Sequence, residues 1–494
     1  MHSYRSSLSV LLPALLLSLA SAQYPGATPP PNDLKRGFDA ITIPKAQSIL
    51  TFLATQCDGR GTGQPGFQKA AEYVAKKFKA AGLKPMGDNG TYFQHQTFYR
   101  SMTVNPKIAG ADGKVLVDRG LVLNPTKENI DVTGPVMVVR AINDKMRLSE
   151  ADAAKLDGKI VILIAPAGRS SVRSQVAAAD TKALLTVVDG NPIFAPSVRR
   201  TPGGPTSMTV SGRIAKKSLG RLGKSIETFA GMTPVSEITI LEPSLTLHVT
   251  GQTKSEDVKV PNVVGLLEGS DPVLKNEYIG IGGHLDHLGV NQAGVVYPGA
   301  DDDGSGSTSV MLIADAMKNN RVKPRRSILF MTFFGEEMGL LGSSFLTDHP
   351  PVPLDKMVSE LQMDMVARDS FGPQNGDPNR IDKVEENMDT IRLVGSKRIS
   401  TDLDHVIQDV NKYVGFRFKY DAEDVYTRSD HYNFAKKGIP IAFLFDGFTP
   451  SYHQPTDTVD TIDFKKLTSA AKLYYLTALA IANTDQAPRK DVGK

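Results

Sequence analysis

From residue 258 onward, short apolar runs alternate with amphipathic helical patterns. The apolar runs cover residues 262–267, 277–282, 327–334, 361–365 and 440–445, and the helical patterns cover 307–317 and 462–483. This alternation is typical of a sheet whose parallel strands are connected by helices. We therefore expect an α/β fold with a mixed, mainly parallel central sheet flanked by helices. Sites in such sheets gather at the carboxyl ends of the strands.

Five segments near these strand ends carry histidine and carboxylate side chains. They read GGHLDHLG around His284, GADDDGSG around Asp302, FFGEEMGLLG around Glu336, QMDMV around Asp364 and SYHQPTDT around His453. A hydrolase with two metal ions needs a bridging carboxylate, further nitrogen and oxygen ligands for each ion, and a base beside the attacking water. The five segments together contain every side chain of such a site.

Each segment alone has a simpler interpretation. An isolated His-x-Asp is usually a surface or capped histidine, an Asp run before Gly is usually a turn or a helix cap, and a Glu pair is usually solvated. Asp364 differs, because it lies between apolar residues where a buried strand is predicted. A buried carboxylate without a partner is costly, so Asp364 favours a metal.

In this combination and order, the segments resemble those of the co-catalytic di-zinc aminopeptidases. That family also holds glutamate carboxypeptidases and, more distantly, glutaminyl cyclases. The resemblance covers residues 37–102 and 258–484, and it implies a zinc-exopeptidase fold of the phosphorylase/hydrolase-like type. Between these two parts, residues 103–257 resemble an inserted protease-associated domain and carry short apolar runs, so we expect a β-rich insert.

The resemblance implies two Zn²⁺ ions per chain, with Asp302 as the bridging ligand. His284 and Asp364 would complete the first site. The family's bridging Asp lies three residues before a Ser-Gly pair, here residues 305–306, which selects Asp302 over its neighbours Asp301 and Asp303.

Glu337 and His453 would complete the second site, and Glu336 would be the general base. Tyr452 matches a tyrosine that hydrogen-bonds the oxyanion, although a core aromatic is the alternative interpretation. Asp286 would accept the imidazole N–H of His284, or otherwise orient that ring.

The segment RSDHYNF matches a family segment on the substrate side of the site. It makes Arg428 and Asp430 weaker candidates for substrate binding, together with Ser429. His431 is expected to be structural or to support the ligands, because the ligand set is complete without it.

The first 22 residues have the pattern of a secretory signal peptide. Arg5 precedes an apolar run over 8–19, and residues 20–22 read Ala-Ser-Ala, a small-residue cleavage site. The run is too short to span a membrane, and no other span is predicted. We expect a mature chain that begins near Gln23 and is secreted or periplasmic.

The remaining boundaries follow from composition. Residues 23–36 are expected to form an extended leader, helices are predicted over 44–56 and 67–82, and residues 485–494 form a tail. Cys57 is the only cysteine, so no intramolecular disulfide can form, and we expect it to be a buried apolar side chain. The net charge of +4 comes from dispersed basic residues, which argues against nucleic acid as a partner.

These patterns predict an exported zinc exopeptidase, most simply an aminopeptidase acting on peptides or proteins. A carboxypeptidase or deacylase on the same scaffold, which would need a cation for the substrate carboxylate, stays open. A glutaminyl cyclase would use one zinc, and a non-catalytic receptor-like protein is the remaining alternative. No repeat, coiled coil or membrane anchor indicates a protein partner.

Overall fold

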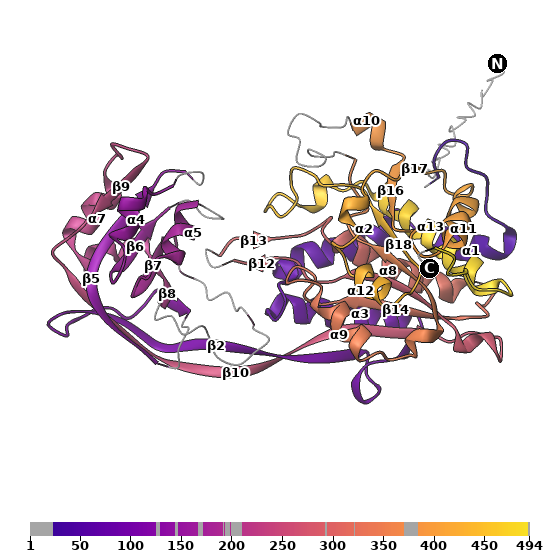
Figure 1. Ribbon diagram of the computed structural model, residues 1–494, viewed down its shortest axis with the longest axis horizontal. Helices are drawn as coiled ribbons and strands as arrows, with labels where there is room; N and C mark the ends of the chain where they lie inside the picture. Colours follow the sequence, from indigo (N-terminus) through magenta and orange to yellow (C-terminus); the bar gives the residue numbers. More distant parts are fainter. Residues whose placement is uncertain are drawn as a thin grey trace, which may run out of the picture.

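The computed structural model (Figure 1) describes most of the chain after residue 22. The described residues are 23–124, 129–143, 147–165, 171–190, 192, 198, 210–291, 294–320, 322–369 and 384–492. The predicted signal peptide lies outside them. No helix in the described ranges is long and apolar enough to cross a membrane.

The main domain is built on a mixed sheet with the strand order β17-β16-β18-β15-β11-β14-β10. Strands β18, β15, β11 and β14 run parallel, whereas β10 and β16 pair antiparallel to their neighbours β14 and β18. The bounds are β10 Thr246–Leu267, β11 Tyr278–His284, β14 Ser327–Phe333, β15 Met357–Met363, β16 Thr390–Val394, β17 Arg417–Lys419 and β18 Ile441–Phe445. The predicted α/β class is confirmed; the predicted strands correspond to β10, β11, β14, β15 and β18, but β10 begins far earlier, β15 ends before Asp364, and β16 and β17 were not predicted.

Strand β14 shows why this sheet is covered on both faces. All seven of its residues are buried. Ile328 and Phe330 join one apolar core, while Leu329 and Met331 join another on the opposite face. The first core is formed with α1 Asn32–Ala40, α2 Ile43–Gln56, α3 Pro65–Ala80, α8 Gly304–Asn319, α11 Thr401–Asn411 and α13 Phe464–Asn483. The second core is formed with α9 Leu341–Asp348 and α12 His431–Lys436.

Two long strands connect the main domain to the insert. β2 Phe93–Gly110 pairs antiparallel with β10, from Val263 opposite Phe93 to Leu247 opposite Gly110. Figure 1 shows this pair as an arm along the lower edge of the molecule. The predicted boundaries after 102 and 257 fall inside the two strands, because the backbone pairing continues from one domain into the other, with one register shift between Thr250 and Gln252.

The insert continues the same sheet beyond β10, in the order β10-β5-β6-β7-β8-β4, but has apolar cores of its own. Strands β5 Asn129–Ala141, β6 Ile160–Ile164, β7 Ala183–Val188 and β8 Val210–Ala215 are parallel, and β4 Leu121–Asn124 and β9 Ile238–Leu241 pair antiparallel at its two edges. Helices α4 Glu150–Ala154, α5 Ser171–Ala178, α6 Leu219–Leu222 and α7 Lys224–Gly231 accompany them. The insert is therefore an α/β unit in which strands predominate. Its assignment as a protease-associated domain stays a prediction.

The N-terminal segment differs from the expected extended leader. Helix α1 begins at Asn32, and Tyr24 is buried, with its backbone N–H donating to the Val414 carbonyl at 2.9 Å. The leader is therefore packed against the main domain, because its aromatic residue finds an apolar place there. Cys57 is completely buried, as expected.

Candidate metal centre

The predicted ligands converge at the carboxyl ends of the parallel strands. His284 is the last residue of β11, Asp364 directly follows β15, and the pair Glu336 and Glu337 follows β14. Asp302 lies just before α8, and the loop after β18 carries His453. The strands thus fix the backbone from which each side chain projects, as expected for this class of sheet.

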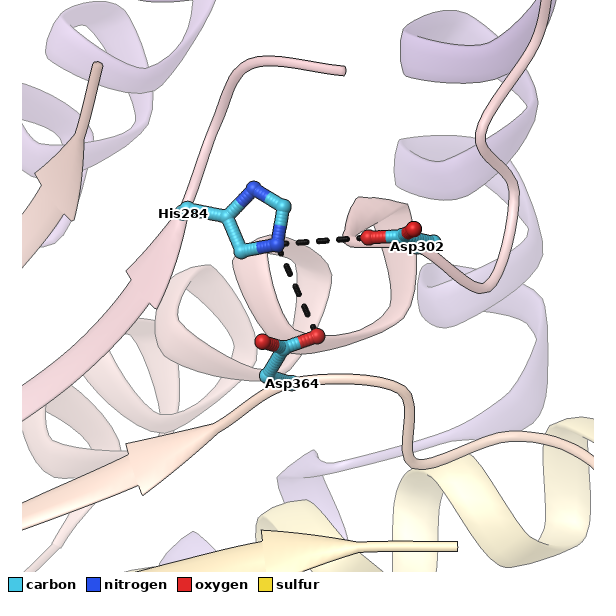
Figure 2. Close-up of side chains that lie close together, drawn as sticks. All are labelled: His284, Asp302 and Asp364. Carbon is cyan, nitrogen blue, oxygen red and sulfur yellow. Dashed lines mark ion pairs between the residues drawn. The ribbon is translucent and has the colours of Figure 1, made fainter. Parts of the chain in front are cut away.

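One group consists of His284, Asp302 and Asp364, shown in Figure 2. The Nε2 atom of His284 is 3.3 Å from Asp302 Oδ1 and 3.5 Å from Asp364 Oδ1. A tetrahedral zinc with bonds of about 2.0–2.2 Å separates its ligand atoms by roughly 3.3–3.6 Å. The spacing of this group therefore suits one zinc ion.

The other carboxylate oxygen of Asp302 faces a second group. His453 Nε2 lies 3.2 Å from Asp302 Oδ2 and 2.9 Å from Glu337 Oε2. Burial lowers the pKa of His453, but the two carboxylates beside it outweigh burial and raise the pKa to about 9. Because Asp302 contributes one oxygen to each group, its position is that of a bridging ligand.

The three consecutive aspartates have different partners. Asp303 caps α8 by accepting the Gly306 N–H at 2.8 Å, and it also accepts the His284 N–H at 3.0 Å. Asp301 accepts the Ala367 N–H at 3.0 Å. Of the three, only Asp302 makes close contacts with histidines of both groups, which supports the choice made from the Ser-Gly spacing.

His287 joins the second group and was not predicted. Its Nδ1 is 2.7 Å from Glu337 Oε1 and 3.6 Å from Asp302 Oδ2, and its side chain is completely buried. A second histidine three residues after His284, in HLDH, was the only signal in the sequence. His287, Asp302 and Glu337 form a second set of side chains able to hold an ion.

Several buried atoms at this point have no hydrogen-bond partner among the described residues. They are both ring nitrogens of His287, Asp302 Oδ2 and Glu337 Oε1; the contacts of His287 Nδ1 with Glu337 Oε1 at 2.7 Å and of Asp302 Oδ2 with His453 Nε2 at 3.2 Å are at ion-pair distance but lack hydrogen-bond geometry. Buried polar atoms without partners are uncommon in folded proteins and indicate a missing ion or water. Since these atoms are nitrogens and carboxylate oxygens, the donor set fits zinc.

Asp286 holds the general-base candidate in place. Its Oδ1 accepts the backbone N–H of Glu336 at 3.1 Å, and its Oδ2 accepts from Thr62 Oγ1 at 2.9 Å. The N–H of His284 Nδ1 donates to the backbone carbonyl of Asp286 at 3.0 Å, whereas the carboxylate is 3.6 Å away. Asp286 thus orients His284 through its main chain and leaves its side chain to fix the turn that carries Glu336.

The Glu336 carboxylate suits a proton-transfer role. Its Oε2 is 3.9 Å from His284 Nε2, farther away than the oxygens of Asp302 and Asp364. Burial raises the pKa of Glu336 well above its usual range, with a partly opposing effect from His284. A raised pKa improves the capacity of a carboxylate to accept and return a proton near neutrality.

The backbone is unusual at one ligand candidate and beside another. His453 has a φ of 56°, and Met365, next to Asp364, has a φ of 55°. A non-glycine residue in this left-handed region costs about 1–2 kcal/mol, and the surrounding contacts must supply that energy. Such conformations cluster at functional sites, so they fit the assignment of this region.

A pocket opens directly beside the two groups. It is lined by Asp302, Glu336, Asp364, Met365, Val425, Arg428, Phe443, Phe445, Phe448, Tyr452 and His453. The Tyr452 ring stacks on His453 with 3.8 Å between centroids. Arg428 donates to the Tyr452 hydroxyl at 3.3 Å and lies over the Phe448 ring at 4.5 Å. Tyr452 and Arg428 therefore lie together at the pocket wall, and their predicted roles in holding the oxyanion and binding substrate stay predictions.

Asp430 and His431 lie away from this wall. Asp430 is completely buried, accepts a hydrogen bond from Ser343 Oγ and does not line the pocket, so the predicted contact with substrate is not seen. His431 Nε2 donates to the Tyr426 carbonyl at 2.7 Å, and its ring stacks on Phe443. These contacts fit the structural role expected for His431.

Asp457 is a further residue that was not predicted. It accepts the backbone N–H groups of Asp301 and Asp302 at 3.1 Å each. Asp457 lies four residues after His453 in the same loop. This loop therefore supplies the ligand candidate His453 and, through Asp457, also holds the backbone of Asp302. The sequence signal was the TDT that follows His453, which reads equally well as a turn.

Comparisons with known proteins agree with this geometry. Residues 262–478 match the model of peptidase family M28. A probable leucine aminopeptidase 2 of Aspergillus oryzae is 28% identical over 328 residues, covering 65% of this chain and 57% of the relative. A probable leucine aminopeptidase of Arthroderma otae is 27% identical over 235 residues, covering 46% of this chain and 59% of the relative. The matches thus span under two thirds of these relatives' length.

Solved structures agree on the fold. A zinc aminopeptidase from Bacillus subtilis superimposes with a TM-score of 0.55 at 18% identity, covering 92% of this chain and 98% of that one. A peptidase M28 precursor from Shewanella amazonensis gives a TM-score of 0.52 at 17% identity, covering 94% and 99%. These structures share the fold of the chain, and the segment that matches the model of peptidase family M28, residues 262–478, is the one that carries the candidate metal centre.

Proposed function

We propose that this protein is a zinc-dependent aminopeptidase. Asp302 carries the proposal, because its two oxygens face two separate groups of ligands beside a pocket that also contains Glu336. His284 and Asp364 would hold one Zn²⁺, and Glu337 and His453 the other, with Asp302 between them. When bound, the two ions supply Lewis acidity to the water and to the scissile carbonyl.

The chain's own residues supply proton transfer and charge stabilisation. Glu336 takes a proton from the attacking water and later returns it to the leaving amine. The Tyr452 hydroxyl donates a hydrogen bond to the developing oxyanion, and Arg428 orients that hydroxyl from behind. Burial, followed by the charges of Asp302 and Glu337, raises the pKa of Tyr452, so that the hydroxyl keeps the proton that it must donate.

The pocket indicates what kind of residue is removed. Five apolar side chains, those of Met365, Val425, Phe443, Phe445 and Phe448, line the pocket beside the six polar ones of the metal centre and its neighbours. Such a wall gains free energy by burying an apolar side chain, at about 25 cal/mol per Å² of area removed from water. The names of the fungal relatives, leucine aminopeptidases, support an apolar N-terminal residue as the substrate.

The test is to give the zinc-loaded protein matched peptides with free and acetylated N-termini and to identify the products by mass spectrometry. Sequential loss of apolar N-terminal residues from the free peptides alone is expected. Loss from the C-terminus, or removal of the acetyl group, would contradict the aminopeptidase and favour a carboxypeptidase or deacylase. Cyclisation of an N-terminal glutamine together with a single bound zinc would favour a glutaminyl cyclase. No product from any peptide would favour the non-catalytic alternative.

Export of the chain is a separate proposal that rests on residues 1–22. Expression with its own N-terminus in a secreting host should yield a mature protein that begins near Gln23, as measured by N-terminal sequencing. Retention of Met1 in the purified protein would contradict it.

A further inference from the structure

Arg60 is a completely buried cation whose partners are unusual. It lies in the glycine-rich segment CDGRGTGQPG between α2 and α3, and in the described part of the chain no carboxylate oxygen lies within 4.0 Å of it. Burying a charge is costly unless hydrogen bonds replace its hydration. Here the guanidinium donates to backbone carbonyls alone: Leu285 at 2.9 Å, Leu53 at 3.3 Å, Pro298 at 2.7 Å, Gly299 at 2.7 Å and Asp302 at 3.5 Å.

Four of these carbonyls belong to two of the loops that carry the metal centre, the loop of His284 and the loop of Asp302. Leu285 lies between His284 and Asp286, while Pro298 and Gly299 lead directly into Asp302. The remaining carbonyl, that of Leu53, lies near the end of α2. A guanidinium has five donors in a fixed plane, so it can set the distance between separate segments of main chain.

The main chain of Arg60 reinforces the same arrangement. Its carbonyl accepts the backbone N–H of His287 at 3.2 Å, and Gly61 forms an isolated parallel bridge with His287. The backbone around these two loops is closely packed. A Cβ on Gly299, which has a φ of +58°, would lie 2.5 Å from the His287 ring, and one on Gly59 would lie 2.2 Å from the Tyr297 carbonyl.

We propose that Arg60 is a positioning residue of the metal centre. It holds the His284 loop and the Asp302 loop at the separation that two adjacent ions require, and it anchors both loops to α2. Arg60 touches neither substrate nor ligand side chains, so it acts through the backbone that carries His284, His287 and Asp302. This inference rests on the proposed zinc site.

The test compares Arg60→Lys with Arg326→Lys, a matched control. Arg326 is also buried, at 1% exposure, and donates to the carbonyls of Ile481 at 2.9 Å and Thr484 at 2.6 Å; unlike Arg60, it also pairs with a carboxylate, that of Glu277, at 2.7 Å. It anchors the end of α13 and not the site. Lysine keeps the charge at both positions but cannot span several carbonyls at once.

Zinc affinity and stoichiometry of both variants and the wild type are measured by calorimetric titration of the metal-free proteins, with circular dichroism as a check of folding. Arg60→Lys is expected to weaken zinc binding by about 10–100-fold, the usual effect of losing a group that orients metal ligands. Arg326→Lys should lower the melting temperature and leave zinc affinity unchanged. Unchanged affinity in Arg60→Lys, or an equal loss in both variants, would overturn the proposal.

A second measurement covers the case in which Arg60→Lys does not fold. Hydrogen exchange of the wild type is followed with and without a zinc chelator. Removal of zinc should speed exchange in residues 285–302 and 58–62 together, because Arg60 links them. Faster exchange in 285–302 alone would overturn the inference. A wild type that binds no zinc would contradict the proposed function itself, whereas a wild type that binds two ions beside an unaffected Arg60→Lys contradicts only the role of Arg60.

Discussion

The main domain and the insert both contain parallel strands that are buried along their whole length, yet among the described residues only the main domain brings together side chains that could hold a metal ion. β15 of the main domain and β7 of the insert are each followed directly by an aspartate, Asp364 and Asp189. The Asp364 side chain is 10% exposed and lies against His284, while the Asp189 side chain is 91% exposed. An acid at a strand end is therefore not a site by itself; convergence with ligands from other strands and exclusion of water make it one.

The largest effect on zinc binding and activity is expected from replacing a carboxylate of the candidate metal centre, compared with replacing the exposed aspartate of the insert. Asp302→Asn should lose zinc from the protein and reduce peptidase activity to background, because the bridging oxygens of both groups are changed. Asp189→Asn, the matched change in the insert, should keep full zinc content. Elemental analysis and peptide hydrolysis of the two purified variants measure this. Retention of two zinc ions in Asp302→Asn would show that another residue bridges the ions.

Replacing the general-base candidate Glu336 should lower the turnover rate without changing the zinc content. Glu336→Ala is expected to lower kcat by about 10²–10⁴-fold, the usual contribution of a general base. Zinc content should stay at the wild-type value, because Glu336 lies farther from His284 than the ligand oxygens do. Steady-state kinetics with metal analysis of the same sample provide the measurement. Wild-type turnover would contradict the assignment of Glu336.

Zinc affinity should depend on pH through His453. The pKa of this residue, about 9 in the metal-free fold, is raised from 6.5, so the protonated ring stabilises the metal-free fold fully below about pH 6.5 and loses that effect as the pH rises through 9. Zinc binds the deprotonated ring, so affinity should fall by about tenfold for each pH unit below 9. Calorimetric titration at several pH values measures the slope, and His453→Gln, which cannot be protonated in this range, should make it shallower while leaving the part due to His284, whose pKa is lowered by burial but raised further by the carboxylates of Asp364 and Glu336. An equal slope in His453→Gln would move the titration to another group.

The smallest effect on function is expected from the core of the insert. Leu185 is completely buried in β7, and Leu185→Ala should destabilise the insert by about 2–5 kcal/mol. Differential scanning calorimetry should show a lower transition temperature, while zinc affinity stays unchanged because the insert has a separate core. A loss of zinc affinity would show that the two domains are coupled more tightly than their cores indicate.

The sequence alone determined the α/β class, the strands β11, β14, β15 and β18 within a few residues, and the segments that supply the ligands. Those features are local: apolar runs such as β14 can be satisfied only by burial, and side chains at strand ends follow from the strands. The order of the strands, the arm formed by β2 and β10 and the helices of the insert were not predicted, because pairing depends on residues far apart in the chain.

Only the tertiary structure decided which groups meet. His287, Asp457 and Arg60 carry no local signal that separates them from a turn or a surface residue, and each acquires its role through contacts with distant segments. Asp301, Asp302 and Asp303 are chemically identical in the sequence. They differ because their carboxylates are directed to Ala367, to the two histidine groups and to the start of α8, and only the folded backbone sets those directions.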